Sequence, residues 1–144
     1  MNDLLTGLYE SWFDYNLHQG LIESVFRAND FGFIGWITIG MTLVCLFIFY
    51  KFWDPVEGQR RKWITILLIN SILIFGISCL VLYNNQGLIE AMGEFTDGEG
   101  VNPHYFILKI AGITSLYALV LALIFCLTPL PVKYFSNDNK HNPF

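Results

Sequence analysis

Few side chains in this sequence could carry out chemistry, and they are scattered. The three histidines, at positions 18, 104 and 141, all lie outside the long apolar stretches, so none is placed to bind a haem iron inside a bilayer. His18 and His104 could meet near Glu23 and Glu90, but two histidines without a regular ligand spacing are weak evidence for a metal site. We therefore expect no bound cofactor and no metal.

Lys109 is the one ionisable side chain well inside a long apolar stretch. Such a lysine usually extends to the membrane surface or pairs with an acid, here Glu90, Glu94 or Asp97. Ion and proton transport would require acidic side chains within the apolar stretches, and there are none. Nucleophile motifs, phosphate-binding loops and paired carboxylates are also missing, so we expect that the protein is not an enzyme.

The composition indicates a membrane protein. Of the 144 residues, 54% are hydrophobic and 14% are charged, whereas soluble domains carry about 25% charged residues. Three stretches are apolar all round and long enough to cross a bilayer as helices. The sequence thus predicts an all-α integral membrane protein, with a transmembrane domain over residues 31–130 and spans at about 31–53, 63–83 and 105–127. Cys45, Cys79 and Cys126 each stand alone in a span, as small hydrophobic side chains do.

Residues 1–30 precede the first span and are amphipathic. A helix is expected over 2–17, and Gly20 is expected to separate it from a second short helical segment. The polar face is acidic, unlike that of helices that bind anionic lipid. The apolar face could therefore lie on the membrane surface or dock on a protein, and the sequence leaves both open. That face contains Leu5, Leu8, Tyr9, Trp12 and Phe13.

Small and polar side chains within the spans predict helix packing. In lipid, helices associate through small residues that allow close approach and through hydrogen bonds between polar side chains. The third span carries a stripe of small residues, and the second span carries an asparagine and two serines. The predicted packing residues are Ala111, Ser115, Ala118 and Ala122 in the third span, and Asn70, Ser71 and Ser78 in the second.

The distribution of basic residues predicts the orientation. Lysines and arginines near the ends of spans favour the cytoplasmic side. Arg60, Arg61 and Lys62 stand between the first two spans, and the polar tail 131–144 carries two more lysines. The N-terminal segment has only Arg27, and the second loop has no basic residue. We expect the N-terminus outside and the C-terminus inside, in a bacterial inner membrane or the inner membrane of an organelle.

The pentapeptide QGLIE occurs twice, at residues 19–23 and 86–90. Five identical residues can recur by chance, and the flanking sequences differ. We interpret the two segments as similar short helices that meet the same membrane surface.

These observations favour a non-catalytic accessory subunit of a larger membrane complex, of the energy-transducing or the secretion type. Its partners would be other membrane subunits and lipid. The alternative is a self-assembling homo-oligomeric pore, with a lumen lined by Asn70, Ser71, Thr114 and Ser115. A small transporter ranks last, because transporters usually carry inverted repeats and polar groups at the midplane. Nucleic-acid binding is not expected, since there is no large basic patch.

Overall fold

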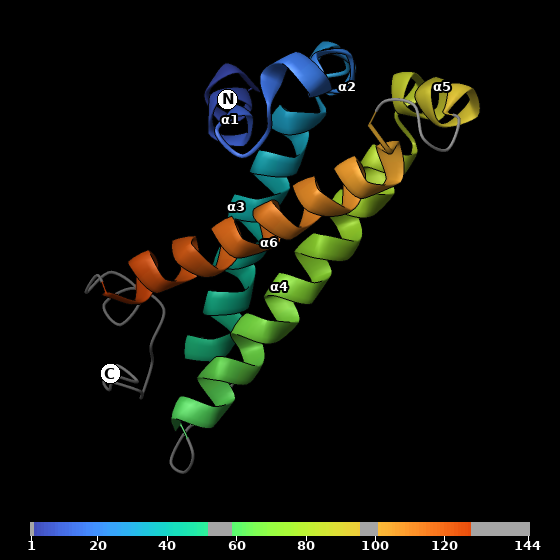
Figure 1. The fold of residues 1–144 in the computed structure, drawn as a ribbon. Helices are drawn as coiled ribbons and strands as arrows, with labels where there is room; N and C mark the ends of the chain where they lie inside the picture. The colour runs from blue at the N-terminus through green and yellow to red at the C-terminus, as the bar shows by residue number, and fades with distance from the viewer. Residues whose placement is uncertain (1, 52–58, 96–100, 128–144) are drawn as a thin grey trace.

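The computed structural model describes residues 2–51, 59–95 and 101–127 (Figure 1). All the regular structure in this part of the chain is helical. The predicted tail 131–144, Phe52 and Trp53, and the side chains of Leu5 and Arg60 lie outside the described residues. The helices are α1 (Asn2–Glu10), α2 (Tyr15–Arg27), α3 (Asp30–Lys51), α4 (Gln59–Tyr83), α5 (Gln86–Glu94) and α6 (Pro103–Leu127).

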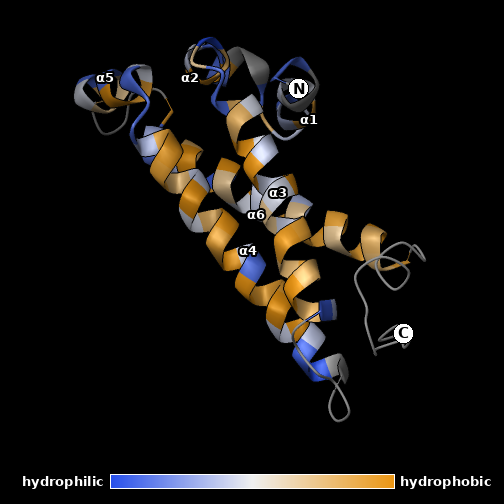
Figure 2. Ribbon diagram, turned by 180° about the vertical axis from the view of Figure 1, so that it is seen from behind, coloured by the Kyte–Doolittle hydropathy of each residue, from blue (hydrophilic) through white to orange (hydrophobic). Residues whose placement is uncertain are grey.

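Three of these helices are long and apolar enough to cross a membrane, as the sequence predicts. They are α3, α6 and the part of α4 from Arg61 to Tyr83, with 22, 25 and 23 residues respectively. At about 1.5 Å per residue each exceeds the thickness of a hydrocarbon core, which is about 30 Å. Figure 2 shows apolar residues along most of each long helix and hydrophilic ones mainly near the helix ends and in the short helices.

Two of the long helices begin earlier than predicted. Helix α4 begins at Gln59, so Arg61 and Lys62 lie in its first turn and not in a loop. Helix α6 begins at Pro103, two residues before the predicted start. Proline is favoured in the first turn of a helix because its missing N–H would have no partner there. The Asn102 side chain caps this turn by accepting the His104 N–H at 2.9 Å.

The predicted helix over 2–17 with a break at Gly20 is wrong. The chain turns after Glu10, where the Trp12 N–H donates to the Tyr9 carbonyl at 2.9 Å. Helix α2 then continues through Gly20 without interruption. The turn has a physical reason, since it brings both Tyr9 and Phe13 into the buried core.

Helices α1, α2 and α5 lie together at the end of the bundle where α3 and α6 begin and α4 ends (Figure 1). We call these three helices the cap. The two QGLIE segments lie in α2 and α5, which pack against each other. Among the long helices, α4 packs against both α6 and α3, and α3 also contacts α6.

The buried apolar side chains form two clusters. The cap-side cluster joins the cap to the adjoining ends of α3, α4 and α6, and it consists of Tyr9, Phe13, Ile22, Val25, Phe31, Ile34, Leu82, Leu88, Phe106, Ile107, Ile110 and Ile113. The far-end cluster lies at the opposite end of the three long helices and consists of Cys45, Leu46, Phe49, Tyr50, Trp63, Ile66, Leu67, Ala122 and Cys126.

Candidate functional site

Hydrogen bonds between residues far apart in the sequence hold the beginning of the chain against α6. The Tyr9 hydroxyl and the Thr114 hydroxyl lie 2.6 Å apart in a buried contact. The Trp12 indole N–H donates to the Tyr117 hydroxyl at 2.8 Å, and the Lys109 ammonium donates to the Trp12 carbonyl at the same distance. Tyr9 and Phe13 of the predicted apolar face are therefore buried against helices of their own chain, whereas Leu8 and Trp12 remain more than 40% exposed.

Lys109 turns toward the cap and forms no ion pair with Glu90 or Glu94, two of the three acids predicted as its partners. Its ammonium lies 4.4 Å from the centre of the Phe13 ring, where a cation–π attraction adds to the hydrogen bond from Lys109 to Trp12. The third predicted acid, Asp97, lies outside the described residues. This lysine acts as a structural tie between α6 and the turn after α1.

Burial of Tyr9 keeps its hydroxyl protonated. Loss of contact with water raises the pKa of Tyr9 to about 12, and the hydrogen bond with Thr114 only partly opposes this shift. A neutral phenol can both donate and accept a hydrogen bond. The Thr114 hydroxyl also donates to the Ile110 carbonyl at 2.8 Å, so the Tyr9 phenol is the donor in the pair when Thr114 uses its proton in this way.

The two histidines in the described residues serve packing and local bonding. His18 lies against Phe13 and Phe106, and its Nδ1 is 2.9 Å from the Asp14 carbonyl oxygen. His104 bonds instead with the Tyr83 hydroxyl, at 3.3 Å. Across the described ranges, no three histidine, cysteine, aspartate or glutamate side chains come together in a way that could hold a metal ion.

The small-residue stripe of α6 is buried inside the chain. Ala111, Ala118 and Ala122 are fully buried, and the half-buried Ser115 hydroxyl bonds with the Ser71 hydroxyl of α4. The structure thus brings the stripe against the chain's own α4. A partner chain cannot reach these alanines while the bundle remains folded.

The polar residues of α4 are also directed inward. The Asn70 amide donates to the Thr42 hydroxyl of α3 at 3.1 Å, and Ser78 is buried near the cap end of α4. The Asn70 Oδ1 atom is buried and has no hydrogen-bond partner among the described residues. Asn70, Ser71, Thr114 and Ser115, which would line a pore, therefore all make contacts within one chain.

The basic residues that predict orientation lie at the end of the bundle opposite the cap. Arg61 is exposed and Lys62 is half-buried in the first turn of α4, which also includes Arg60. Positive charge at a helix N-terminus opposes the helix dipole. These residues therefore weaken their own helix slightly, and their position suits contact with an anionic surface.

Helices α2 and α5 cross at small residues. A Cβ atom built on Gly87 would lie 2.7 Å from the Cβ of Ser24, so the two backbones are closer than any larger residue would allow. Ser24 of α2 and Gly87 of α5 are the residues at this contact, whereas nothing lies within 4 Å of a Cβ built on Gly20. Small residues allow close helix packing. Sequence reasoning missed this crossing, although the repeated QGLIE segment marks it.

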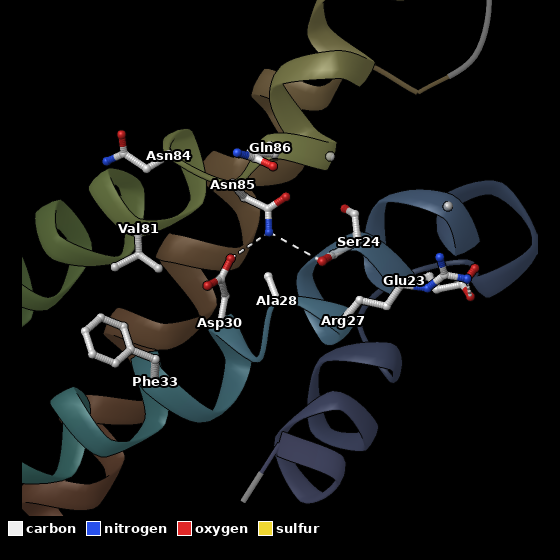
Figure 3. Close-up of a pocket in the computed structure, with 12 residues that line it drawn as sticks. Glu23, Ser24, Arg27, Ala28, Asp30, Phe33, Val81, Asn84, Asn85 and Gln86 are labelled. Atoms are coloured by element: carbon white, nitrogen blue, oxygen red, sulfur yellow. Dashed lines mark hydrogen bonds and ion pairs between the residues drawn. The ribbon is translucent and has the colours of Figure 1, made fainter.

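Beside this crossing is a cleft of about 810 Å³ between α2, α5 and the adjoining ends of α3 and α4 (Figure 3). Its wall is apolar on one side and charged on the other. Figure 3 shows Phe33 and Val81 on one side and Glu23 and Arg27 on the other, with Asn85 and Asp30 between them. The remaining lining residues are Gly20, Ser24, Ala28, Asn84, Gln86 and Gly87.

Asn85 organises the cleft through both ends of its amide. Its Oδ1 accepts the Leu88 N–H at 3.1 Å and so caps α5, which is a common role for asparagine. Its Nδ2 donates to the Asp30 carboxylate at 2.7 Å and lies 3.4 Å from the Ser24 carbonyl. This one side chain links α2, α3 and α5, and it fixes Asp30 at the centre of the cleft.

The charged and polar groups of the cleft are suited to binding. The exposed pair Glu23–Arg27, 2.6 Å apart, places opposite charges at its rim. Asp30 is half-buried, and the Ser24 hydroxyl donates to the Leu21 carbonyl at 2.8 Å. Sequence analysis did not predict this site, because Asp30 and Asn85 are 55 residues apart and neither forms part of a motif.

Comparison of the chain with protein-family models, with curated proteins and with solved structures found no match.

Proposed function

We propose that this protein is a non-catalytic accessory subunit of a larger multi-subunit membrane complex, and that the cap is its docking surface. The observation that carries this proposal is a contrast between the spans and the cap. In the spans, the polar side chains Asn70, Ser71 and Thr114 bond within the chain, and the outer faces are apolar. The cap instead exposes several carboxylates to water.

The charge of the cap suggests the kind of partner. Asp3, Glu90 and Glu94 are exposed, and Arg27 is the one lysine or arginine in the described residues of the cap. Arg27 is already paired with Glu23. Charge complementarity mainly determines which surfaces meet and how fast they associate. A basic surface on a neighbouring subunit fits this cap.

The outer faces of the spans fit lipid or the apolar helices of other subunits. Large side chains such as Trp36, Ile72 and Leu80 are more than 60% exposed on these faces. A lumen would need polar side chains at such positions. These exposed apolar side chains therefore give no support to a pore. Co-purification would reveal self-association as the recovery of many copies of this chain alone.

Co-purification from the native membrane tests the proposal. We expect an affinity-tagged wild-type chain, extracted in mild detergent, to carry a reproducible set of different chains at a fixed ratio. Replacing Asp3, Glu90 and Glu94 together by lysine should release them, whereas Ile72→Ala on a lipid-facing surface should retain them. Recovery of the chain alone, or of many copies of it alone, would contradict the proposal.

We further propose that the cap faces the outside of a bacterial inner membrane, because the basic turn of α4 lies at the opposite end. A membrane-impermeant thiol reagent applied to intact cells tests this in a chain whose three native cysteines are replaced. It should label a cysteine placed at Gly93, which is exposed on α5, and not one placed at Arg61. The reverse pattern would invert the orientation.

A further inference from the structure

The cleft beside the α2–α5 crossing lies at the boundary between the cap and the apolar spans. Phe33, three residues into α3, is 54% exposed and forms the apolar wall of the cleft together with Val81 of α4. Asn85 and Gln86 provide polar groups further along the same cleft, and Asn84 adds another beside Val81 (Figure 3). A molecule that fills the cleft would thus have one apolar and one polar part, as a phospholipid at a membrane surface does.

The charges in the cleft favour a positive group over a negative one. Its charged side chains are Glu23, Arg27 and Asp30. Because Glu23 and Arg27 neutralise each other at 2.6 Å, Asp30 contributes the remaining negative charge. Asp30 lies in the first turn of α3, where the helix dipole stabilises a carboxylate. A phosphate alone would find one cation in the lining of the cleft, Arg27 at its rim, which Glu23 already neutralises.

Asp30 also has unused hydrogen-bonding capacity. An ionised carboxylate can accept about four hydrogen bonds. Within the described residues its side chain receives one, from Asn85. A primary ammonium brings three N–H donors, whereas a quaternary ammonium brings none. The amides of Asn84 and Gln86 lie in the same cleft and offer further acceptors.

We propose that this cleft binds the primary-ammonium headgroup of a phosphatidylethanolamine-type lipid. The ammonium bonds to the Asp30 carboxylate, the phosphate lies near Arg27 at the rim, and the acyl chains follow Phe33 and Val81 into the membrane. This inference is independent of the proposed docking role of the cap. A lysine from a partner protein has the same charged group, but the exposed apolar wall of the cleft favours a lipid.

Native mass spectrometry of the full-length chain in detergent tests the proposal. The protein is mixed with equal amounts of phosphatidylethanolamine, phosphatidylcholine and phosphatidylglycerol. We expect one ethanolamine lipid to be retained about tenfold more than either of the others, because a hydrogen bond to a charged group is worth that much in affinity. Asp30→Asn should remove this preference, and Glu90→Gln, an exposed cap acid outside the cleft, should leave it unchanged.

A second variant distinguishes a loss of lipid binding from a loss of folding. Ala28→Leu extends into the cleft from an exposed position and leaves Asp30 and Asn85 intact. It should also abolish the ethanolamine preference, while the unfolding temperature in lipid-free detergent stays close to that of the wild type. Equal retention of the three lipids by the wild type would overturn the proposal. So would an ethanolamine preference that survives both cleft variants, or one that Glu90→Gln removes equally.

Discussion

The cap end and the far end of the bundle are held together by different kinds of contact. At the cap end, Tyr9 and Trp12 reach across more than 100 residues of sequence to oxygen atoms on α6, at 2.6 and 2.8 Å. At the far end, the Trp63 indole and the Tyr50 hydroxyl share the Cys126 sulfur, at 3.2 and 3.7 Å. Sulfur is a weak hydrogen-bond acceptor. The far end is therefore held together more by close packing of its side chains than by hydrogen bonds.

This difference follows from the surroundings of each end. Where the cap meets water, burying aromatic rings is favourable in itself, and here Tyr9 stacks on Phe31 and Phe13 packs on Phe106. Between helices surrounded by lipid, this driving force is absent, and close approach through small residues replaces it. The comparison predicts that added volume will damage the span interface most, and that lost hydrogen bonds will cost less.

Ala118→Leu should cause the largest loss. Ala118 is fully buried on α6, so three additional carbon atoms must separate the packed helices. We expect the free energy of unfolding in detergent to fall by about 3 kcal/mol, at the upper end of the usual overpacking cost. Gly112→Leu is the matched control, because nothing lies within 4 Å of a Cβ at that exposed position of the same helix. Equal losses in both variants would show that the stripe is not the packed face.

Gly87→Ala tests the crossing within the cap. The new methyl group would lie 2.7 Å from the Ser24 Cβ, which is bound to the backbone of α2 and cannot move aside alone. Separating the two helices should cost about 2 kcal/mol, measured by thermal unfolding. Gly93→Ala on the same helix meets no atom within 4 Å, and its higher helix propensity should leave stability unchanged or slightly raised. A neutral Gly87→Ala would disprove the close crossing.

Tyr9→Phe tests the tie between α1 and α6. Loss of the hydrogen bond to Thr114 should lower the free energy of unfolding by about 1 kcal/mol at neutral pH. The folded pKa of Tyr9 is about 12, above its ordinary value of 10, so folding favours the protonated phenol. Its contribution is complete below pH 10 and is lost as the pH rises from 10 to 12.

The difference in stability between the wild type and Tyr9→Phe should therefore shrink to zero and then change sign across that pH range, because a rise in pKa from 10 to about 12 outweighs a hydrogen bond of about 1 kcal/mol. Using the difference removes the contributions of the other tyrosines and of the lysines, which are present in both proteins. A difference that stays constant from pH 9 to pH 12 would mean that Tyr9 is not buried against α6.

The Asn70–Thr42 pair should give the smallest effect. Thr42→Val removes the acceptor of the one hydrogen bond made by the Asn70 side chain. Such bonds between membrane helices contribute about 0.6 kcal/mol on average. The double variant Asn70→Leu with Thr42→Val should recover most of this loss, because no polar group then remains unpaired. A double-mutant cycle without coupling would contradict the contact.

The positions of the three spans could be predicted because they depend on local sequence alone. An apolar stretch such as Phe31–Lys51 needs no information from the rest of the chain to be recognised as a span. The turn after Glu10 could not be predicted in this way. It depends on Phe13 packing against Phe106, a contact that no local pattern reveals. For the same reason, the sequence indicated Gly20 as a break, whereas α2 continues through this exposed glycine without interruption.

The candidate cleft was even harder to predict from the sequence. Asn85 and Asp30 each look like ordinary helix-capping residues, and only the fold brings them to within 2.7 Å. The α6 stripe shows the opposite case, since its spacing is visible in the sequence. What the sequence does not reveal is the neighbour, which the structure identifies as α4 of the same chain through the Ser71–Ser115 contact.

Disulfide formation between positions 24 and 87 tests most directly the claim that one chain supplies both its own spans and the cap packed on them. In a chain whose native cysteines are replaced, Ser24→Cys and Gly87→Cys put two thiols at the α2–α5 crossing, where a shift of about 1 Å takes the Cβ atoms from 2.7 Å to the separation of about 3.8 Å that a disulfide needs. Mild oxidation in the membrane should give a monomer without free thiols, at a yield independent of protein concentration. Oxidation only to disulfide-linked dimers would mean that α5 packs on another chain, and would contradict the account.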